Sequence, residues 1–83
     1  MRPSALVFLP ARDEEAMISA TLARLRAVQT RFASACEVIS LLVDDGSSDA
    51  TVARAVSAGV DRVVRHDRAR GLGAATRTGL LQA

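Results

Sequence analysis

Aromatic residues are scarce in this sequence of 83 residues. Phe8 and Phe32 are the only aromatic side chains apart from a single histidine, since tryptophan and tyrosine are absent. The core must therefore be built from valine, leucine, isoleucine and alanine, which suits helices packed on a parallel sheet. A surface that stacks nucleic-acid bases needs aromatic side chains. We therefore expect no nucleic-acid partner.

Cysteine and long apolar runs are also lacking. The single cysteine, Cys36, excludes a disulfide framework and a Cys/His metal site. No apolar run approaches the roughly 18 residues that a membrane-spanning helix needs. A short apolar stretch at residues 5–9 is ended by Pro10 and by charged residues, which is too early for a signal peptide. We expect a cytoplasmic protein.

Lysine is absent, so all eleven basic residues are arginines, and the net charge is only +2. Four arginines gather around the only histidine, His66: Arg62, Arg65, Arg68 and Arg70. Two aspartates interrupt this cluster, which is typical of a solvated face. The alternative interpretation is that this arginine cluster contacts a phosphate, or the cytoplasmic face of an anionic membrane.

Three apolar runs predict strands at residues 5–9, 38–43 and 60–64. A helix is predicted after each strand, because apolar residues then recur at helical spacing. The first helix follows the acidic residues 13–15, which suit a helix N-terminus, and the others cover residues 50–58 and 71–82. We expect Val56, Leu72 and Leu80 to face inward. Strand–helix alternation with short links predicts an α/β fold with a parallel sheet.

Two of the predicted loops are dense in carboxylates, at residues 10–15 and 44–49. Both follow strands, and in an open parallel sheet ligands bind outside the carboxyl ends of the strands. A carboxylate accepts hydrogen bonds from a base N–H or from ribose hydroxyls, and an acid-rich pocket can hold a divalent cation. Gly46 allows the sharp turn that brings backbone close to a ligand. The sequence therefore predicts a ligand site at this edge.

Some polar residues of these loops have a simpler interpretation. Ser48 and Asp49 are expected to cap the second helix. Asp13 and Glu15 are expected to be solvated. His66 is expected to be a loop residue rather than a catalyst.

Three motifs resemble those of family 2 glycosyltransferases. Residues 9–15, LPARDEE, resemble the P-A-x-N-E-E opening of that family, and residues 43–51, VDDGSSDAT, resemble its V-D-D-G-S-x-D-x-T signature. Residues 70–80, RGLGAATRTGL, are similar to its N-x-G-x-G-x-A stretch, in the form seen in polyprenyl-phosphate (dolichyl-phosphate) mannosyl- and glucosyltransferases. The motifs occur in family order and at family spacing over nearly the whole chain.

The resemblance implies the N-terminal half of a GT-A fold, with three βα units of a Rossmann-like sheet. Residues 1–83 would form one nucleotide-sugar-binding part of a glycosyltransferase domain. In the family, the positions that match Val43 and Asp45 hold the base and ribose of the donor. Contacts with the nucleotide sugar are implied at seven positions: Pro10, Arg12, Glu14, Val43, Asp45, Arg70 and Gly71.

The sequence departs from the family pattern at three of its loop positions. Asp13 stands where asparagine is usual, Arg12 where an aromatic residue is common, and Arg70 replaces part of a common Asn-x-Gly pattern. These departures leave the identity of the donor open.

The Asp-x-Asp metal motif of the family follows a fourth strand, beyond Ala83. We therefore expect no catalytic residue and no metal ligand in this span, and no sugar transfer by the span alone. The resemblance implies Mg²⁺ or Mn²⁺ for the full enzyme, where it neutralises the departing nucleoside diphosphate.

The expected function is transfer of a sugar from a GDP- or UDP-linked donor to an acceptor such as a polyprenyl phosphate at the membrane surface. The alternative is a non-catalytic module of the same fold that binds a nucleotide or a partner. An NAD(P)-binding domain is a weaker option, since residues 71–76 match the dinucleotide fingerprint only in part. We also expect self-association through the apolar edge of the first strand, residues 5–9.

Overall fold

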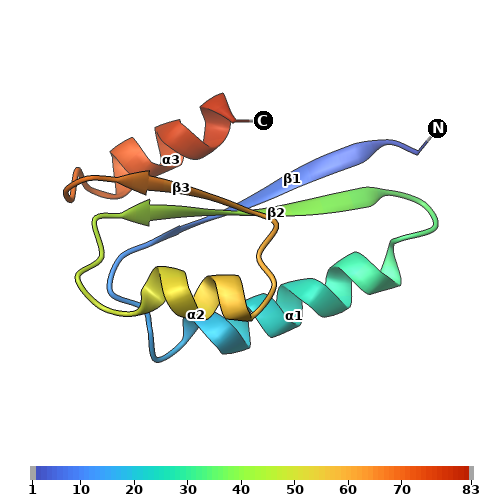
Figure 1. The fold of residues 1–83 in the computed structure, drawn as a ribbon. Coiled ribbons are helices and arrows are strands. Elements are labelled where there is room, and N and C mark those ends of the chain that lie inside the picture. The colour runs from blue at the N-terminus through green and yellow to red at the C-terminus, as the bar shows by residue number, and fades with distance from the viewer. Residues whose placement is uncertain (1, 83) are drawn as a thin grey trace.

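The protein, described here by a computed structural model over residues 2–82, is a three-stranded parallel sheet with helices on both faces (Figure 1). Strands and helices alternate along the chain: β1 (Ser4–Ala11), α1 (Ile18–Arg31), β2 (Glu37–Asp45), α2 (Thr51–Ser57), β3 (Arg62–His66) and α3 (Leu72–Leu81). The predicted α/β fold of three βα units is confirmed. Met1 and Ala83 lie outside the described residues.

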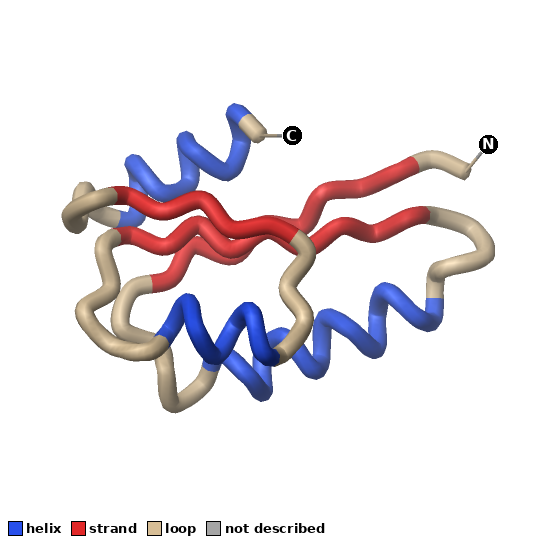
Figure 2. The backbone as a smooth tube through the Cα atoms, in the orientation of Figure 1, coloured by secondary structure: helices blue, strands red, loops and turns tan. Residues whose placement is uncertain are grey.

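The strand order is β1-β2-β3, so β2 pairs with both neighbours and β1 is an edge strand of the described sheet. The register places Ala11 of β1 beside Asp44, and Asp45 beside His66 of β3. Because all three strands are parallel, their carboxyl ends meet at one edge. The loops that follow them gather there, at the left of Figure 2.

Alternating side chains of β2 divide the core into two layers. Leu42 packs toward α1 and α2, against Ile18 and Leu22. Val43 packs toward α3, against Ala75. Both layers are visible in Figure 1, where α1 and α2 lie below the sheet and α3 above it. Cover on both faces is the physical reason for the mainly apolar sequence of this strand.

Small residues bring α3 close to the sheet. Gly79 lies on the Phe8 ring, so closely that an added Cβ would overlap the ring. Ala75, one turn earlier, is buried. The prediction that Leu72 and Leu80 face inward is wrong, because these side chains are 70% and 62% exposed. The small residues occupy the contact face, which leaves the leucines on the flanks of the helix.

Two further predictions about the helices are wrong. Val56 is 60% exposed, because the short helix α2 buries Thr51 and Ala55 instead. The acidic residues 13–15 do not start the first helix, since α1 begins at Ile18 with no acidic residue in its first turn. Their hydrogen bonds to the neighbouring loop hold them outside the helix.

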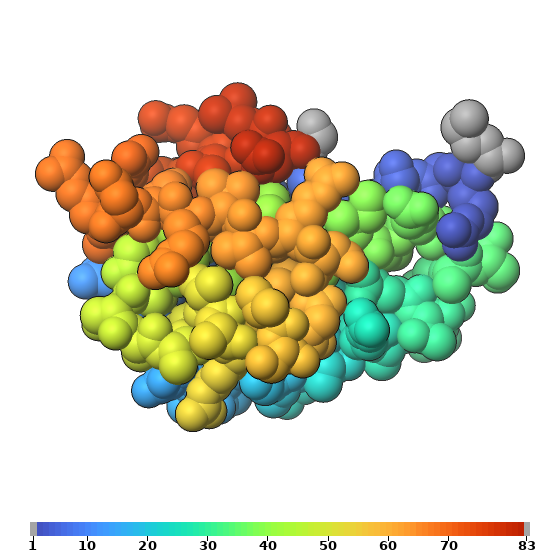
Figure 3. Space-filling view, viewed as in Figure 1, coloured from blue at the N-terminus to red at the C-terminus, as the bar shows by residue number. Residues whose placement is uncertain are grey.

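The amino-terminal ends of β1 and β2 extend beyond α3. Figure 3 shows a hollow beside these strand ends, between α3 and the start of β1. A cavity of about 340 Å³ lies there, lined by Ser4, Ala5, Leu6, Ile39, Arg62 and Gln82. None of the predicted site residues lines it, so the candidate site belongs to the opposite edge of the sheet.

Candidate functional site

The loop after β1 and the loop after β2 are joined by hydrogen bonds between backbone and side chains. The N–H groups of Asp13 and Glu14 donate to Ser47 Oγ and Thr51 Oγ1, each at 2.9 Å. In the reverse direction, Asp13 Oδ1 accepts the N–H of Ser48 at 2.8 Å. The serines and the threonine of the VDDGSSDAT motif therefore hold the first loop in place.

Acidic side chains complete this junction. The N–H of Glu15 donates to Asp49 Oδ2 at 3.2 Å, and Glu15 Oε2 accepts the N–H of Ala50 at 3.1 Å. Both residues were expected to be solvated. Asp13 is exposed, as expected, and Glu15 is half-buried, but each carboxylate also accepts a backbone N–H of the other loop. Asp13 also has a φ of 51°, a left-handed conformation that aspartate tolerates.

The two residues expected to cap α2 behave differently. Asp49 Oδ1 accepts the N–H of Thr51 at 2.9 Å, which satisfies a free donor at the start of the helix. The Thr51 hydroxyl also donates to Asp49, and this bond is the main cause that lowers the pKa of Asp49. Ser48 does not cap the helix, because its hydroxyl donates to Asp13 Oδ1 at 3.4 Å instead.

Asp45, the last residue of β2, attaches the third loop to the sheet. Its Oδ1 accepts the N–H of Arg70 and the Nδ1–H of His66, both at 2.8 Å, and its Oδ2 accepts the N–H of Gly71 at 2.8 Å. The bond from His66, followed by that from Arg70, lowers the pKa of Asp45 to about 2 against the opposing effect of burial. Asp45 is therefore a carboxylate anion at neutral pH.

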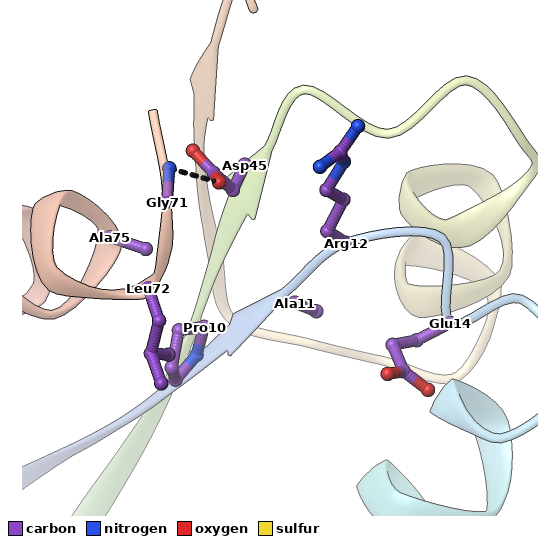
Figure 4. Close-up of a pocket in the computed structure, with 8 residues that line it drawn as sticks. All are labelled: Pro10, Ala11, Arg12, Glu14, Asp45, Gly71, Leu72 and Ala75. Atoms are coloured by element: carbon purple, nitrogen blue, oxygen red, sulfur yellow. Dashed lines mark hydrogen bonds between the residues drawn. The ribbon is translucent and has the colours of Figure 1, made fainter. Parts of the chain in front are cut away.

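A pocket of about 280 Å³ opens between the first and third loops. Figure 4 shows Asp45, Gly71, Leu72 and Ala75 on the side of α3, and Pro10, Ala11, Arg12 and Glu14 along the end of β1 and its loop. The pocket thus lies outside the carboxyl ends of adjacent strands, where ligands bind to open parallel sheets.

Five of the seven predicted contact residues line this pocket: Pro10, Arg12, Glu14, Asp45 and Gly71. The structure does not bring the other two into the lining. Val43 is fully buried in the core beneath α3. The Arg70 side chain is exposed and pairs with Asp67 at 3.4 Å, while its backbone N–H reaches Asp45. The roles of all seven in binding stay predictions.

Glu14 and Asp45 lie at the same edge of the sheet and border the same pocket, but their carboxylates do not meet. Figure 4 shows Glu14 beyond Ala11, near the start of α1. The Glu14 carboxylate makes no hydrogen bond to another residue within 2–82, so it is available to a ligand. A smaller cavity of about 170 Å³ adjoins the pocket there and shares Pro10, Ala11 and Glu14 with it.

The model of one protein family, described as glycosyl transferase family 2, matches residues 6–83. The chain belongs to glycosyl transferase family 2. Family membership implies a nucleotide-sugar donor and an acceptor. No curated protein and no solved structure was found to match the chain. The resemblance to polyprenyl-phosphate sugar transferases within the family stays a prediction.

Sequence reasoning missed the place of His66 in this glycosyltransferase chain. His66 was expected in a loop, but it is the last residue of β3 and is only 6% exposed. Its Nε2 lies 2.8 Å from Thr78 Oγ1 of α3, and its Nδ1 bonds to Asp45. The signal in the sequence was weak: His66 follows the predicted third strand, residues 60–64, by two positions, and its place beside Asp45 depends on the register of β2 and β3.

Asp44 of the same glycosyltransferase motif points to the opposite face from Asp45. Its side chain is completely buried, and its Oδ2 accepts the N–H of Ser47 at 3.2 Å and lies 3.6 Å from Arg65 Nε. Its Oδ1 has no hydrogen-bond partner among residues 2–82. Asp44 therefore stabilises the turn after β2 and does not line the pocket.

The described part of this glycosyltransferase, residues 2–82, has no group of three or more His, Cys, Asp or Glu side chains arranged to hold a metal ion. Most of the carboxylates of the two acidic loops are bonded to backbone N–H groups. The divalent cation implied by the resemblance stays an expectation for the full enzyme. No described helix combines the length and apolar character needed to cross a membrane.

Proposed function

We propose that the pocket binds the nucleoside of a GDP- or UDP-linked sugar, and that the full enzyme transfers this sugar to an acceptor such as a polyprenyl phosphate. The observation that carries the proposal is the convergence of three motif-bearing loops on one pocket. Glu14 comes from the first loop, Asp45 from the second and Gly71 from the third.

The chemistry of the lining suits a nucleoside. Asp45 is an anion that accepts hydrogen bonds, and the Glu14 carboxylate is a second acceptor. Pro10, Leu72 and Ala75 supply apolar contact for the faces of a base or ribose. The volume of about 280 Å³ lies near the lower limit of about 300 Å³ for small-molecule sites. It has room for the nucleoside, with the diphosphate and the sugar outside.

The arginines at this edge support the remaining parts of the proposal. Arg12 borders the pocket with an exposed guanidinium group, which can stack on a base or meet a phosphate. Arg65 and Arg70 are also exposed near the third loop. These cations suit a polyprenyl phosphate held at the cytoplasmic face of a membrane. The full enzyme would use Mg²⁺ or Mn²⁺ bound by residues outside 1–83.

Calorimetric titration with GDP-sugars and UDP-sugars in the presence of Mn²⁺ tests the proposal. We expect one of the two nucleotide classes to bind. Glu14→Gln removes a charge without breaking a bond within residues 2–82, and it should weaken binding by about tenfold, the value of one charge-assisted hydrogen bond. The matched control is Glu37→Gln, because Glu37 starts β2 at the far end of the sheet and pairs with Arg2.

The control should bind like the parent protein. If neither nucleotide class binds, or if both substitutions weaken binding equally, the proposed site is wrong. The alternative of a non-catalytic nucleotide-binding module has its own outcome. In that case the full-length protein binds a nucleotide sugar but transfers no labelled sugar to polyprenyl phosphate.

A partner of a second kind is proposed at the free edge of β1. Residues 5–9 are apolar, and an unpaired strand edge presents backbone N–H and C=O groups that can pair with another chain. We propose that this edge recruits a second copy of the chain.

A further inference from the structure

We propose that His66 is a positioning residue that, by bonding to Asp45 Oδ1, leaves the carboxylate a single acceptor position, on Oδ2, for one N–H or O–H group of a bound nucleoside. The inference rests on the proposed nucleotide site and adds a rule for what Asp45 can recognise. His66 does not line the pocket, so it acts through Asp45 and not by contact with a ligand.

The acceptor positions of Asp45 can be counted. A carboxylate offers about four positions, two on each oxygen. Oδ1 receives the His66 ring and the N–H of Arg70, and Oδ2 receives the N–H of Gly71. Three positions are therefore filled inside the protein. The one that remains, on Oδ2, suits a single donor, so Asp45 cannot chelate two hydroxyls of a ribose with both oxygens.

The direction of the bond from His66 follows from its partner. A carboxylate anion only accepts, so Nδ1 carries the proton of the neutral imidazole, and Nε2 then accepts the hydroxyl hydrogen of Thr78. When the ring is protonated, Nε2 donates to the same hydroxyl oxygen. Both forms of the ring keep the bond to Asp45, so the position of the carboxylate does not depend on the charge of His66.

Thr78 connects this arrangement to α3. Its Oγ1 lies 2.8 Å from His66 Nε2, and it stands in the helix whose first turn supplies Leu72 to the pocket. The His66 ring is thereby held at both nitrogens between β2 and α3. It is buried, which fixes its orientation. Outer partners held in this way orient the groups that contact ligands.

The test compares two amides that each replace one ring nitrogen. His66→Asn places an N–H near the position of Nδ1 and keeps a donor for Asp45. His66→Gln reaches toward the position of Nε2 and keeps the bond to Thr78 but not the bond to Asp45. Val63→Ala is the stability control, because Val63 is in the same strand but packs on the opposite face of the sheet.

Two measurements are made on each protein: titration of the Asp45 carboxyl carbon by NMR, and calorimetric titration with the nucleotide that the parent protein binds. The groups near Asp45 are His66 of β3, Arg70 before α3, and Arg12 and Glu14 of the first loop, while α3 adds the neutral Thr78. The two variants differ in the bond that residue 66 keeps: Asn keeps the bond to Asp45, and Gln keeps the bond to Thr78.

In His66→Gln the pKa of Asp45 should rise and nucleotide affinity should fall about tenfold. In His66→Asn both should stay near the parent values, and in Val63→Ala only the stability should change. If the Asn and Gln variants give the same Asp45 titration and the same affinity, the proposal is overturned. If the parent protein binds no nucleotide, the proposed function fails. The role of His66 is tested independently of that result, because an unchanged Asp45 titration in His66→Gln would overturn it.

Discussion

Gly46 lies where the loop after β2 packs closely against the loop after β3. Its replacement by alanine is the most informative perturbation. The residue follows Asp45 with a φ of +73°. A Cβ at this position would lie 2.5 Å from the backbone nitrogen of Ala69 and 2.6 Å from the carbonyl carbon of Arg68. Both atoms belong to backbone of the third loop, so neither can move away without moving that loop.

Two costs add in Gly46→Ala. A left-handed conformation costs an L-residue about 1–2 kcal/mol. Overpacking against atoms that yield only by backbone shifts costs about 1–3 kcal/mol. We therefore expect Gly46→Ala to lower the free energy of unfolding by about 2–5 kcal/mol, a large share of the roughly 5–15 kcal/mol that stabilises a typical domain.

Two other glycines separate these costs. Gly71 has a φ of +93°, but an added Cβ would meet nothing within 4 Å, so Gly71→Ala carries the backbone strain of about 1–3 kcal/mol without the clash. Gly73 lies in α3 with ordinary helical φ and open space around it. Gly73→Ala should therefore be neutral or stabilise the fold by up to about 1 kcal/mol.

Urea unfolding followed by circular dichroism measures all three variants. The expected order of destabilisation is Gly46→Ala first, then Gly71→Ala, then Gly73→Ala. If Gly46→Ala unfolds within the error of Gly73→Ala, the contact between the second and third loops is wrong. If Gly46→Ala is milder than Gly71→Ala, the clash contributes nothing, and the reasoning about close packing fails.

Acid should unfold the protein in a defined range, because hydrogen bonds lower the pKa values of Asp45 and Asp49 from the ordinary value of 3.8. The stabilisation that these ionised carboxylates give is complete above about pH 4, and it is lost as the pH falls toward the Asp45 pKa of about 2. Urea unfolding at several pH values measures this loss. A free energy of unfolding that stays constant over this range would show that the hydrogen bonds to these carboxylates are absent. The free edge of β1 should give concentration-dependent association in light scattering. Ala5→Lys on that edge should suppress the association, and the control Ala35→Lys, placed after α1, should not. A stable monomer of the unsubstituted protein would exclude the edge as a contact between copies.

The architecture could be predicted from local patterns. Apolar runs that end at proline or at an acidic turn identified the first two strands, because a strand covered on both faces needs mainly apolar side chains. The third strand was predicted at residues 60–64 and lies two residues later, at Arg62–His66. The orientation of α3 could not be predicted. Leu72 and Leu80 have the spacing of a core face, but the close approach of Gly79 to Phe8 decides which side of the helix meets the sheet.

The candidate site was predicted as a set of positions, and five of its seven residues line one pocket. The contacts within the set were not predictable, because they depend on the other loops. Asp13 and Glu15 look like solvated charges in the sequence, yet they bond to the backbone of the loop after β2. Val43 looks like a contact residue, yet its side chain belongs to the core beneath α3.

The order of apolar and acidic segments in the sequence by itself determined the parallel α/β sheet and the edge where the pocket lies, since these depend on residue type and spacing along the chain. The family followed from the resemblance of three motifs. Only the tertiary structure decided how the carboxylates are used. The bonds from His66, Arg70 and Gly71 to Asp45 join residues more than twenty positions apart. Such bonds require directions and distances that exist only after β2, β3 and α3 have packed together.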